Sequence, residues 1–143
     1  MKYWLLILVL SSCAYPKKTT PFILEKPNSD KATVYLYRTY TQADSLNPDV
    51  PWFYINDNKI GKLSLGGYYV QQIDPGEATV YYKDSAFGRP LPWKGLKIKF
   101  PVKANESYYV KFSIEGLNRK TDLLLVPNVY AEKEITQTQL LKN

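Results

Sequence analysis

Lysine and tyrosine occur two positions apart in three segments of this chain that are otherwise rich in apolar residues. A lysine ammonium group can bind phosphate or carboxylate, and a tyrosine ring can stack on a sugar. These are the contacts that an anionic glycan, a lipid headgroup or an envelope protein would require. The candidate contact residues are Tyr81, Lys83, Lys97, Lys99, Tyr109 and Lys111.

Three predicted strands must position these residues. They cover 77–83, 94–102 and 108–114, and in each of them apolar and polar positions alternate with a period of two. If the strands form an antiparallel meander, their apolar positions face the core and the candidate residues share the solvated face of one sheet. The alternative is structural, with tyrosines forming cross-strand pairs and lysines keeping exposed strands from aggregating.

The residue types that are missing exclude several kinds of catalysis. The chain has no histidine and a single cysteine, so it cannot form a Ser-His-Asp triad, a Cys-His pair or the common histidine-based zinc sites. Most of its 13 acidic residues lie beside turn residues, where they favour turns and solubility. We therefore expect a non-enzymatic protein with no cofactor and no metal. The alternative is a hydrolase or lyase that uses paired carboxylates on cell-wall polysaccharide.

The N-terminus has the pattern of an export signal. Lys2 precedes an apolar run of eight residues, Tyr3 to Leu10, which is shorter than the roughly 20 residues that span a bilayer. The run ends in Leu-Ser-Ser-Cys and resembles the lipobox of bacterial lipoproteins. In that signal the chain is cut before the cysteine, and the cysteine sulfur receives a diacylglyceryl group. The resemblance implies that Cys13 is the lipidated N-terminus of the mature chain.

A lipidated Cys13 also implies a location and a class of partner. The chain would be bound to a membrane of the cell envelope through its lipid, because two or more acyl chains hold a protein stably. Residue 14 is Ala, whereas Asp at this position resembles an inner-membrane retention signal, so we expect the outer membrane. Partners that fit this location are an anionic glycan, a lipid headgroup or an envelope protein. Nucleic acid does not fit it.

The remainder of the chain divides into a tether, one domain and a tail. Residues 1–12 form the expected signal peptide, and 13–30 form the lipidated cysteine and a proline-containing flexible tether. Residues 31–126 contain seven or eight short alternating stretches separated by turns such as Asp74-Pro75-Gly76, and they predict an all-β fold. We expect a single antiparallel β-sandwich. Residues 127–143 are expected to be a tail or a short helix.

The order of these strand and turn signals resembles one bacterial family. The matching stretches, in chain order, are 32–38, 54–61, Gly66-Gly67-Tyr68-Tyr69, Asp74-Pro75-Gly76 and Tyr108-Tyr109-Val110-Lys111. They are similar to the family called domain of unknown function 2846, whose members are small envelope proteins that often carry lipoprotein signals. The resemblance implies a β-sandwich related in outline to prealbumin-like or PEGA-type modules. It implies no activity. The expected function is therefore binding or scaffolding in the envelope.

Overall fold

The structure is a computed structural model, and it describes residues 22–40, 50–86, 89–90, 95–115 and 120–141. Eleven strands and one helix lie in this part of the chain. In chain order they are β1 (Ala32–Arg38), β2 (Trp52–Ile55), β3 (Asn58–Lys62), β4 (Gly67–Ile73), β5 (Gly76–Lys83), β6 (Ser85–Ala86), β7 (Arg89–Pro90), β8 (Lys97–Val102), β9 (Ser107–Glu115), β10 (Lys120–Val126), α1 (Asn128–Ile135) and β11 (Gln139–Leu140).

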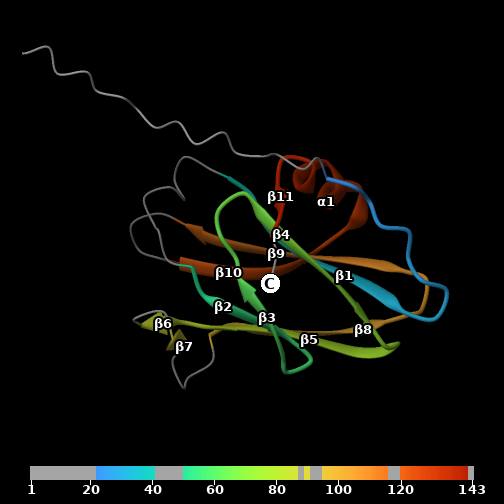
Figure 1. Ribbon diagram of the computed structural model, residues 1–143, viewed down its shortest axis with the longest axis horizontal. Coiled ribbons are helices and arrows are strands. Elements are labelled where there is room, and N and C mark those ends of the chain that lie inside the picture. Colours follow the sequence, from blue (N-terminus) through green and yellow to red (C-terminus); the bar gives the residue numbers. More distant parts are fainter. Residues whose placement is uncertain (1–21, 41–49, 87–88, 91–94, 116–119, 142–143) are drawn as a thin grey trace, which may run out of the picture.

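Two sheets pack face to face, as Figure 1 shows. The five-stranded sheet has the order β10-β9-β1-β4-β11, and the four-stranded sheet has the order β3-β2-β5-β8. Strands β6 and β7 pair with each other as a small separate ribbon. The predicted all-β sandwich with a short C-terminal helix is thereby confirmed.

Strand β1 shows that the five-stranded sheet buries residues on both of its faces. All seven of its residues are buried. Val34 and Leu36 face the other sheet and join the main core, as their alternation predicts. Tyr35 and Tyr37 point the opposite way and belong to a second buried cluster, which also contains Ala131 and Ile135 of α1. A sheet with apolar residues on both faces needs a cover on its outer side, and α1 supplies it.

Residues with positive φ close the turns that join the strands. Asn56 and Asp57, with φ of 48° and 64°, form the two-residue connection of the β2–β3 hairpin. Positive φ at both central residues is the geometry that matches the twist of paired strands. Gly76, with φ of 136°, starts β5 directly after the predicted Asp74-Pro75 turn. This turn carries the chain from the five-stranded sheet into the four-stranded sheet.

The predicted meander is wrong in one of its two pairings. Strands β5 and β8 are antiparallel neighbours, as expected, but β9 lies in the other sheet and pairs in parallel with β1. Asn105, with φ of 61°, turns the chain between β8 and β9, and its N–H donates to the Lys31 carbonyl. Alternation marks the apolar face of each strand, but two successive strands can present that face to one core from opposite sheets. Periodicity alone therefore does not distinguish the two arrangements.

Two N-terminal predictions fall on residues that the structure does not describe. The signal peptide and Cys13 lie before residue 22, outside the described residues. Among the residues that are described, no helix is both long enough and apolar enough to cross a membrane.

Candidate functional site

The outer face of the four-stranded sheet gathers lysines and aromatic rings from all four of its strands. Phe53 and Ile55 of β2 face the core, as do Val80 of β5 and Phe100 of β8, so the alternate positions point outward. We call this surface the lysine–aromatic face. Its residues are Trp52, Tyr54, Lys59, Lys62, Tyr81, Lys83, Lys97 and Lys99.

Two tyrosines form the base of this face. Tyr54 and Tyr81 are cross-strand partners, and their rings stack with centroids 5.0 Å apart and planes within 4°. The Tyr81 hydroxyl donates to Asp57 Oδ1 at 2.9 Å. Burial, together with this hydrogen bond, raises the pKa of Tyr81 to about 12. Tyr54 and Tyr81 expose only 8% and 3% of their surface. Tyr81 was expected to be a solvated contact residue, but its ring is buried in a structural pair.

The lysine side chains cover these aromatic rings. Lys59 Nζ lies 3.6 Å and Lys62 Nζ 5.1 Å from the centroid of the Trp52 ring, and Lys83 Nζ lies 5.0 Å from the Tyr54 centroid. A cation over a ring face is attracted by the ring quadrupole. The apolar stems of lysine can also cover apolar surface while the ammonium groups stay in water. The rings thus hold the ammonium groups in place above the sheet.

The face carries an excess of positive charge. Lys99 forms an ion pair with Glu77 at 2.6 Å. In the part of the chain that the structure describes, no carboxylate lies within ion-pair distance of Lys59, Lys62, Lys83 or Lys97. Positively charged groups without acidic partners attract anions from solution. The arrangement is suited to binding a surface or polymer with several negative charges.

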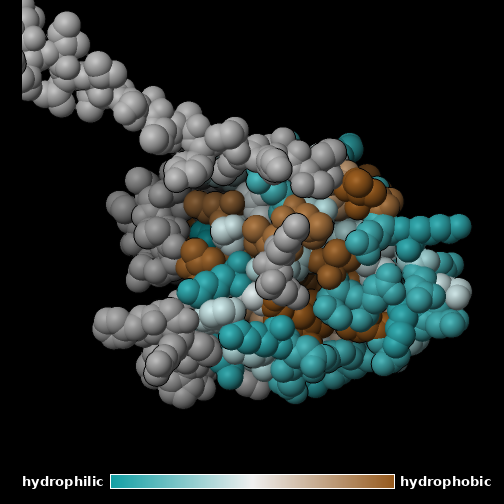
Figure 2. All heavy atoms as spheres, viewed as in Figure 1, coloured by the Kyte–Doolittle hydropathy of each residue, from teal (hydrophilic) through white to brown (hydrophobic). Residues whose placement is uncertain are grey.

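A cleft of about 570 Å³ opens where the lysine–aromatic face meets the edge of the sandwich. Among the described residues, Trp52 Nε1 is a buried donor without a hydrogen-bond partner. In Figure 2, hydrophobic surface is visible near the middle of the molecule, with hydrophilic surface over the region of β3, β5 and β8. The cleft thus combines apolar walls with two cations. Its lining residues are Trp52, Lys59, Ile60, Gly61, Lys62, Tyr69 and Leu141.

Two of the six predicted contact residues lie on the other side of the molecule. Tyr109 and Lys111 belong to β9 and point outward from the five-stranded sheet, beneath α1. The Tyr109 side chain is fully buried, and its ring stacks on Tyr35 at 4.9 Å. The prediction that they share one surface with Lys97 and Lys99 was therefore wrong. Its physical cause is the passage of the chain between sheets at Asn105.

Four tyrosines on this opposite side form what we call the covered tyrosine layer: Tyr35, Tyr37, Tyr68 and Tyr109. Its hydroxyl groups find partners in the elements that cover it. Tyr37 donates to Glu134 Oε2 at 2.8 Å, and Tyr109 donates to Glu132 Oε1 at 3.3 Å. Burial, followed by the influence of these glutamates, raises the pKa of both tyrosines well above the ordinary value. They remain neutral hydrogen-bond donors.

Lys111 also helps to hold α1 against the five-stranded sheet. Its ammonium group forms an ion pair with Glu134 at 2.9 Å. Burial opposes ionisation of Glu134, but the hydrogen bonds from Lys111 and Tyr37 outweigh it and lower the pKa of the carboxyl. Lys111 therefore fastens α1 to the sheet.

The N-terminal segment also covers this layer. The Phe22 ring contacts Tyr35 and Tyr68 edge-on, with centroids 5.8 Å and 5.4 Å apart. The Glu25 N–H donates to the Tyr35 hydroxyl at 2.9 Å. Part of the region expected to be tether is thus packed on the domain.

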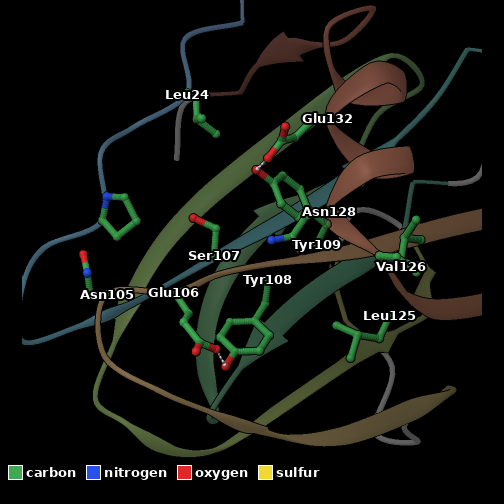
Figure 3. Close-up of a pocket in the computed structure, with 12 residues that line it drawn as sticks. Leu24, Asn105, Glu106, Ser107, Tyr108, Tyr109, Leu125, Val126, Asn128 and Glu132 are labelled. Carbon is green, nitrogen blue, oxygen red and sulfur yellow. Dashed lines mark hydrogen bonds between the residues drawn. The ribbon is translucent and has the colours of Figure 1, made fainter.

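A hollow of about 590 Å³ lies where this segment, β9 and the start of α1 meet (Figure 3). Leu24 reaches it from the segment and Glu132 from the helix, and the Tyr109–Glu132 hydrogen bond forms part of its wall. Glu106 on its rim accepts a hydrogen bond from Tyr108 at 2.6 Å. Both carboxylates that line the hollow, Glu106 and Glu132, thus accept hydrogen bonds from tyrosines of β9.

Sequence reasoning missed half of the lysine–aromatic face. Trp52 and Tyr54 of β2 lie outside the three strands from which the candidate contact residues were predicted. Alternation with Phe53 and Ile55 was the signal that could have found them, and the Asn56-Asp57 hairpin places Lys59 opposite Tyr54. No cluster of three or more metal-ligating side chains occurs within the described residues.

Comparison with known proteins assigns a family but supplies no activity. A search of curated proteins found no match. Residues 28–122, more than half of the chain, match the family described as protein of unknown function (DUF2846). This range includes every residue of the lysine–aromatic face and excludes α1. The chain therefore belongs to the family of proteins of unknown function DUF2846.

Proposed function

We propose that this protein is a non-enzymatic envelope lipoprotein, anchored to a membrane through Cys13, whose sandwich binds an anionic component of the envelope. Four lysines without carboxylate partners among the described residues, all on one sheet face, carry this proposal. The Trp52 ring lies beneath the ammonium groups of Lys59 and Lys62, and the Tyr54 ring lies beneath that of Lys83. The outer-membrane location rests on Ala14 and the lipobox resemblance.

The geometry favours lysines as the contact groups over tyrosines. Tyr54 and Tyr81 are too deeply buried to stack on a sugar. Lys99 and Lys111 already have glutamate partners. A ligand with several negative charges would instead meet Lys59, Lys83 and Lys97, with Lys62 beside the Trp52 cleft.

A sedimentation assay with purified, membrane-free cell wall tests the binding. The full chain carrying Cys13→Ala is used, so that no lipid contributes. Replacing Lys59, Lys83 and Lys97 together by Gln should weaken binding on the order of 10- to 100-fold at low salt, because each lysine near an anionic surface contributes about 1 kcal/mol. The loss should shrink as salt is added.

A charge-matched variant provides the control. Lys26, Lys120 and Lys133 are exposed and lie on the N-terminal segment, β10 and α1, away from the lysine–aromatic face. Their joint replacement by Gln removes the same charge and should change binding little. Equal binding by both triple variants at every salt concentration would reject the proposed face and support the purely structural use of these lysines.

Cell fractionation tests the anchor separately. The native chain should sediment with membranes and require detergent for release, and Cys13→Ala should lose this association. Recovery of Cys13→Ala in the same detergent-dependent fraction would contradict the lipid anchor. The enzymatic alternative would gain support if the protein released soluble fragments from purified cell wall.

A further inference from the structure

We propose that the lysine–aromatic face is turned away from the membrane that holds Cys13 and meets an anionic cell-wall glycan polymer across the intervening space. This inference rests on the lipid anchor and the binding face proposed above, and it selects between the partners that share this anionic chemistry. Its basis is where the N-terminal segment is fastened to the domain.

The segment is held on the side opposite the lysines. Phe22 packs on Tyr35 and Tyr68, which point outward from the five-stranded sheet. The Tyr35 hydroxyl holds the backbone of Glu25. Figure 1 shows the start of this segment, in blue, next to α1, with β5 and β8 at the far side of the molecule. The anchored end of the domain is thus the side of the covered tyrosine layer.

Chain length then limits which side can lie on the membrane. Cys13 and Phe22 are nine residues apart, a distance of at most about 30 Å for a fully extended chain. A random coil of that length spans on average about 15–18 Å. Stacked sheets lie about 10 Å apart, and side chains on both outer faces bring the thickness to roughly 20 Å. To lay the lysines on the membrane, the chain would have to pass around the sandwich edge while stretched beyond its average coil length.

Exposed apolar residues point to the same orientation independently. Ile23 and Leu24 of the segment are 65% and 51% exposed, and Val129 and Tyr130 in the first turn of α1 are 68% and 64% exposed. All four belong to the elements that cover the five-stranded sheet. Apolar and tyrosine side chains are favoured at a membrane interface. The covered side therefore suits the headgroup region, and the charged side suits the polymer beyond it.

Fluorescence quenching in vesicles tests the orientation. The lipidated full chain has its only native thiol occupied, so a single introduced cysteine can be labelled. Val129→Cys and Lys97→Cys place the label at exposed positions on the two opposite sides. With a quencher attached to the lipid headgroups, the label at 129 should be quenched several-fold more than the label at 97. Equal quenching, or stronger quenching at 97, would overturn the inference.

A second variant tests the proposed cause. Phe22→Ala removes the edge contacts with Tyr35 and Tyr68, so the difference in quenching between the two labels should shrink. Ser29→Ala, at an exposed polar position of the same segment, should leave the difference unchanged. If the difference in quenching between the two labels were undiminished in the Phe22→Ala protein, docking of the segment would not set the orientation.

The proposed function and the orientation can fail separately. If the Lys59, Lys83 and Lys97 variant binds cell wall as well as the native chain does, the binding face is wrong. If that variant is impaired but the label at 97 is the more strongly quenched, the lysines bind the anchoring membrane and only the orientation is wrong. Vesicles with and without anionic lipid distinguish this second case, because only anionic headgroups would then attract the lysines.

Discussion

Tyr35 and Tyr54 occupy outward positions on different sheets of the same sandwich, and both are buried, but by different means. Tyr35 lies beneath the N-terminal segment and stacks on Tyr109. Tyr54 stacks on Tyr81 and is covered by the stem and ammonium group of Lys83. One face is thus covered by a helix and a chain segment, and the other by lysine side chains alone. A ligand can displace a single lysine side chain from its ring at a lower cost than it can displace a packed helix.

The two faces also differ in whether their lysines have acidic partners. On the covered side, Lys111 is paired with Glu134, and the glutamates of α1 accept hydrogen bonds from tyrosine hydroxyls. On the open side, Lys97 has no carboxylate partner within the described residues. The same two residue types therefore stabilise the fold on one face and remain available to a partner on the other.

The largest expected loss of stability comes from removing a ring from the covered tyrosine layer. Tyr35→Ala removes a fully buried ring from the stack, and such changes typically cost about 3–5 kcal/mol of unfolding free energy. Tyr130→Ala makes the same substitution at an exposed position of α1 and should cost about 0.5 kcal/mol or less. Urea denaturation of both proteins measures the contrast. Similar losses would mean that the layer is not tightly packed.

A substitution in the β4–β5 connection between the two sheets should cause an intermediate loss of stability. Gly76 has φ of 136°, and a Cβ there would meet no atom within 4 Å. Gly76→Val should therefore cost on the order of 1–3 kcal/mol through backbone strain alone, without any steric clash. Thermal unfolding measures this loss. An unchanged melting temperature would contradict the turn geometry that sends the chain from β4 to β5.

A smaller effect is expected for the two ion pairs, whose contributions to the free energy of unfolding should depend differently on pH. Glu134→Gln should cost about 1 kcal/mol at neutral pH, because the carboxylate accepts hydrogen bonds from Tyr37 and Lys111. The pKa of Glu134 is lowered in the folded state, so this stabilisation is present above the unfolded pKa and is lost as pH falls through the lower folded value. Native protein and variant should then converge in stability in acid.

The matched change on the open face is Glu77→Gln. Glu77 and Lys99 are largely exposed, with 59% and 52% of their side chains accessible, so the loss should be about 0.5 kcal/mol or less. Urea unfolding of both variants over a pH series makes the comparison. A pH-independent loss for Glu134→Gln, or an equal loss for Glu77→Gln, would remove the distinction between the faces.

Much of the fold could be predicted because alternation is a local property. Val34, Leu36, Phe100 and Val102 all face the core as their spacing predicts. The assignment of β9 to its sheet could not be predicted in this way, because it depends on tertiary packing. The Tyr109–Tyr35 stack, the parallel pairing with β1 and the cover from α1 all act over long sequence distances.

The site was predicted in part for the same reason. Lys83, Lys97 and Lys99 lie together because β5 and β8 are neighbours, as the pattern predicts. Whether an outward tyrosine is solvated, stacked or covered depends on its neighbours across strands, which alternation does not identify. Tyr81 and Tyr109 were both expected at the surface, and both are buried.

Amine acylation of the Cys13→Ala chain, with and without purified cell wall, tests the central claim most directly. Modification of each lysine is quantified by peptide mass. If the lysine–aromatic face is the binding face, cell wall should slow the modification of Lys59, Lys83 and Lys97 several-fold. The modification rates of Lys26, Lys120 and Lys133 should not change. Equal protection of both sets, or protection of the second set alone, would contradict the account.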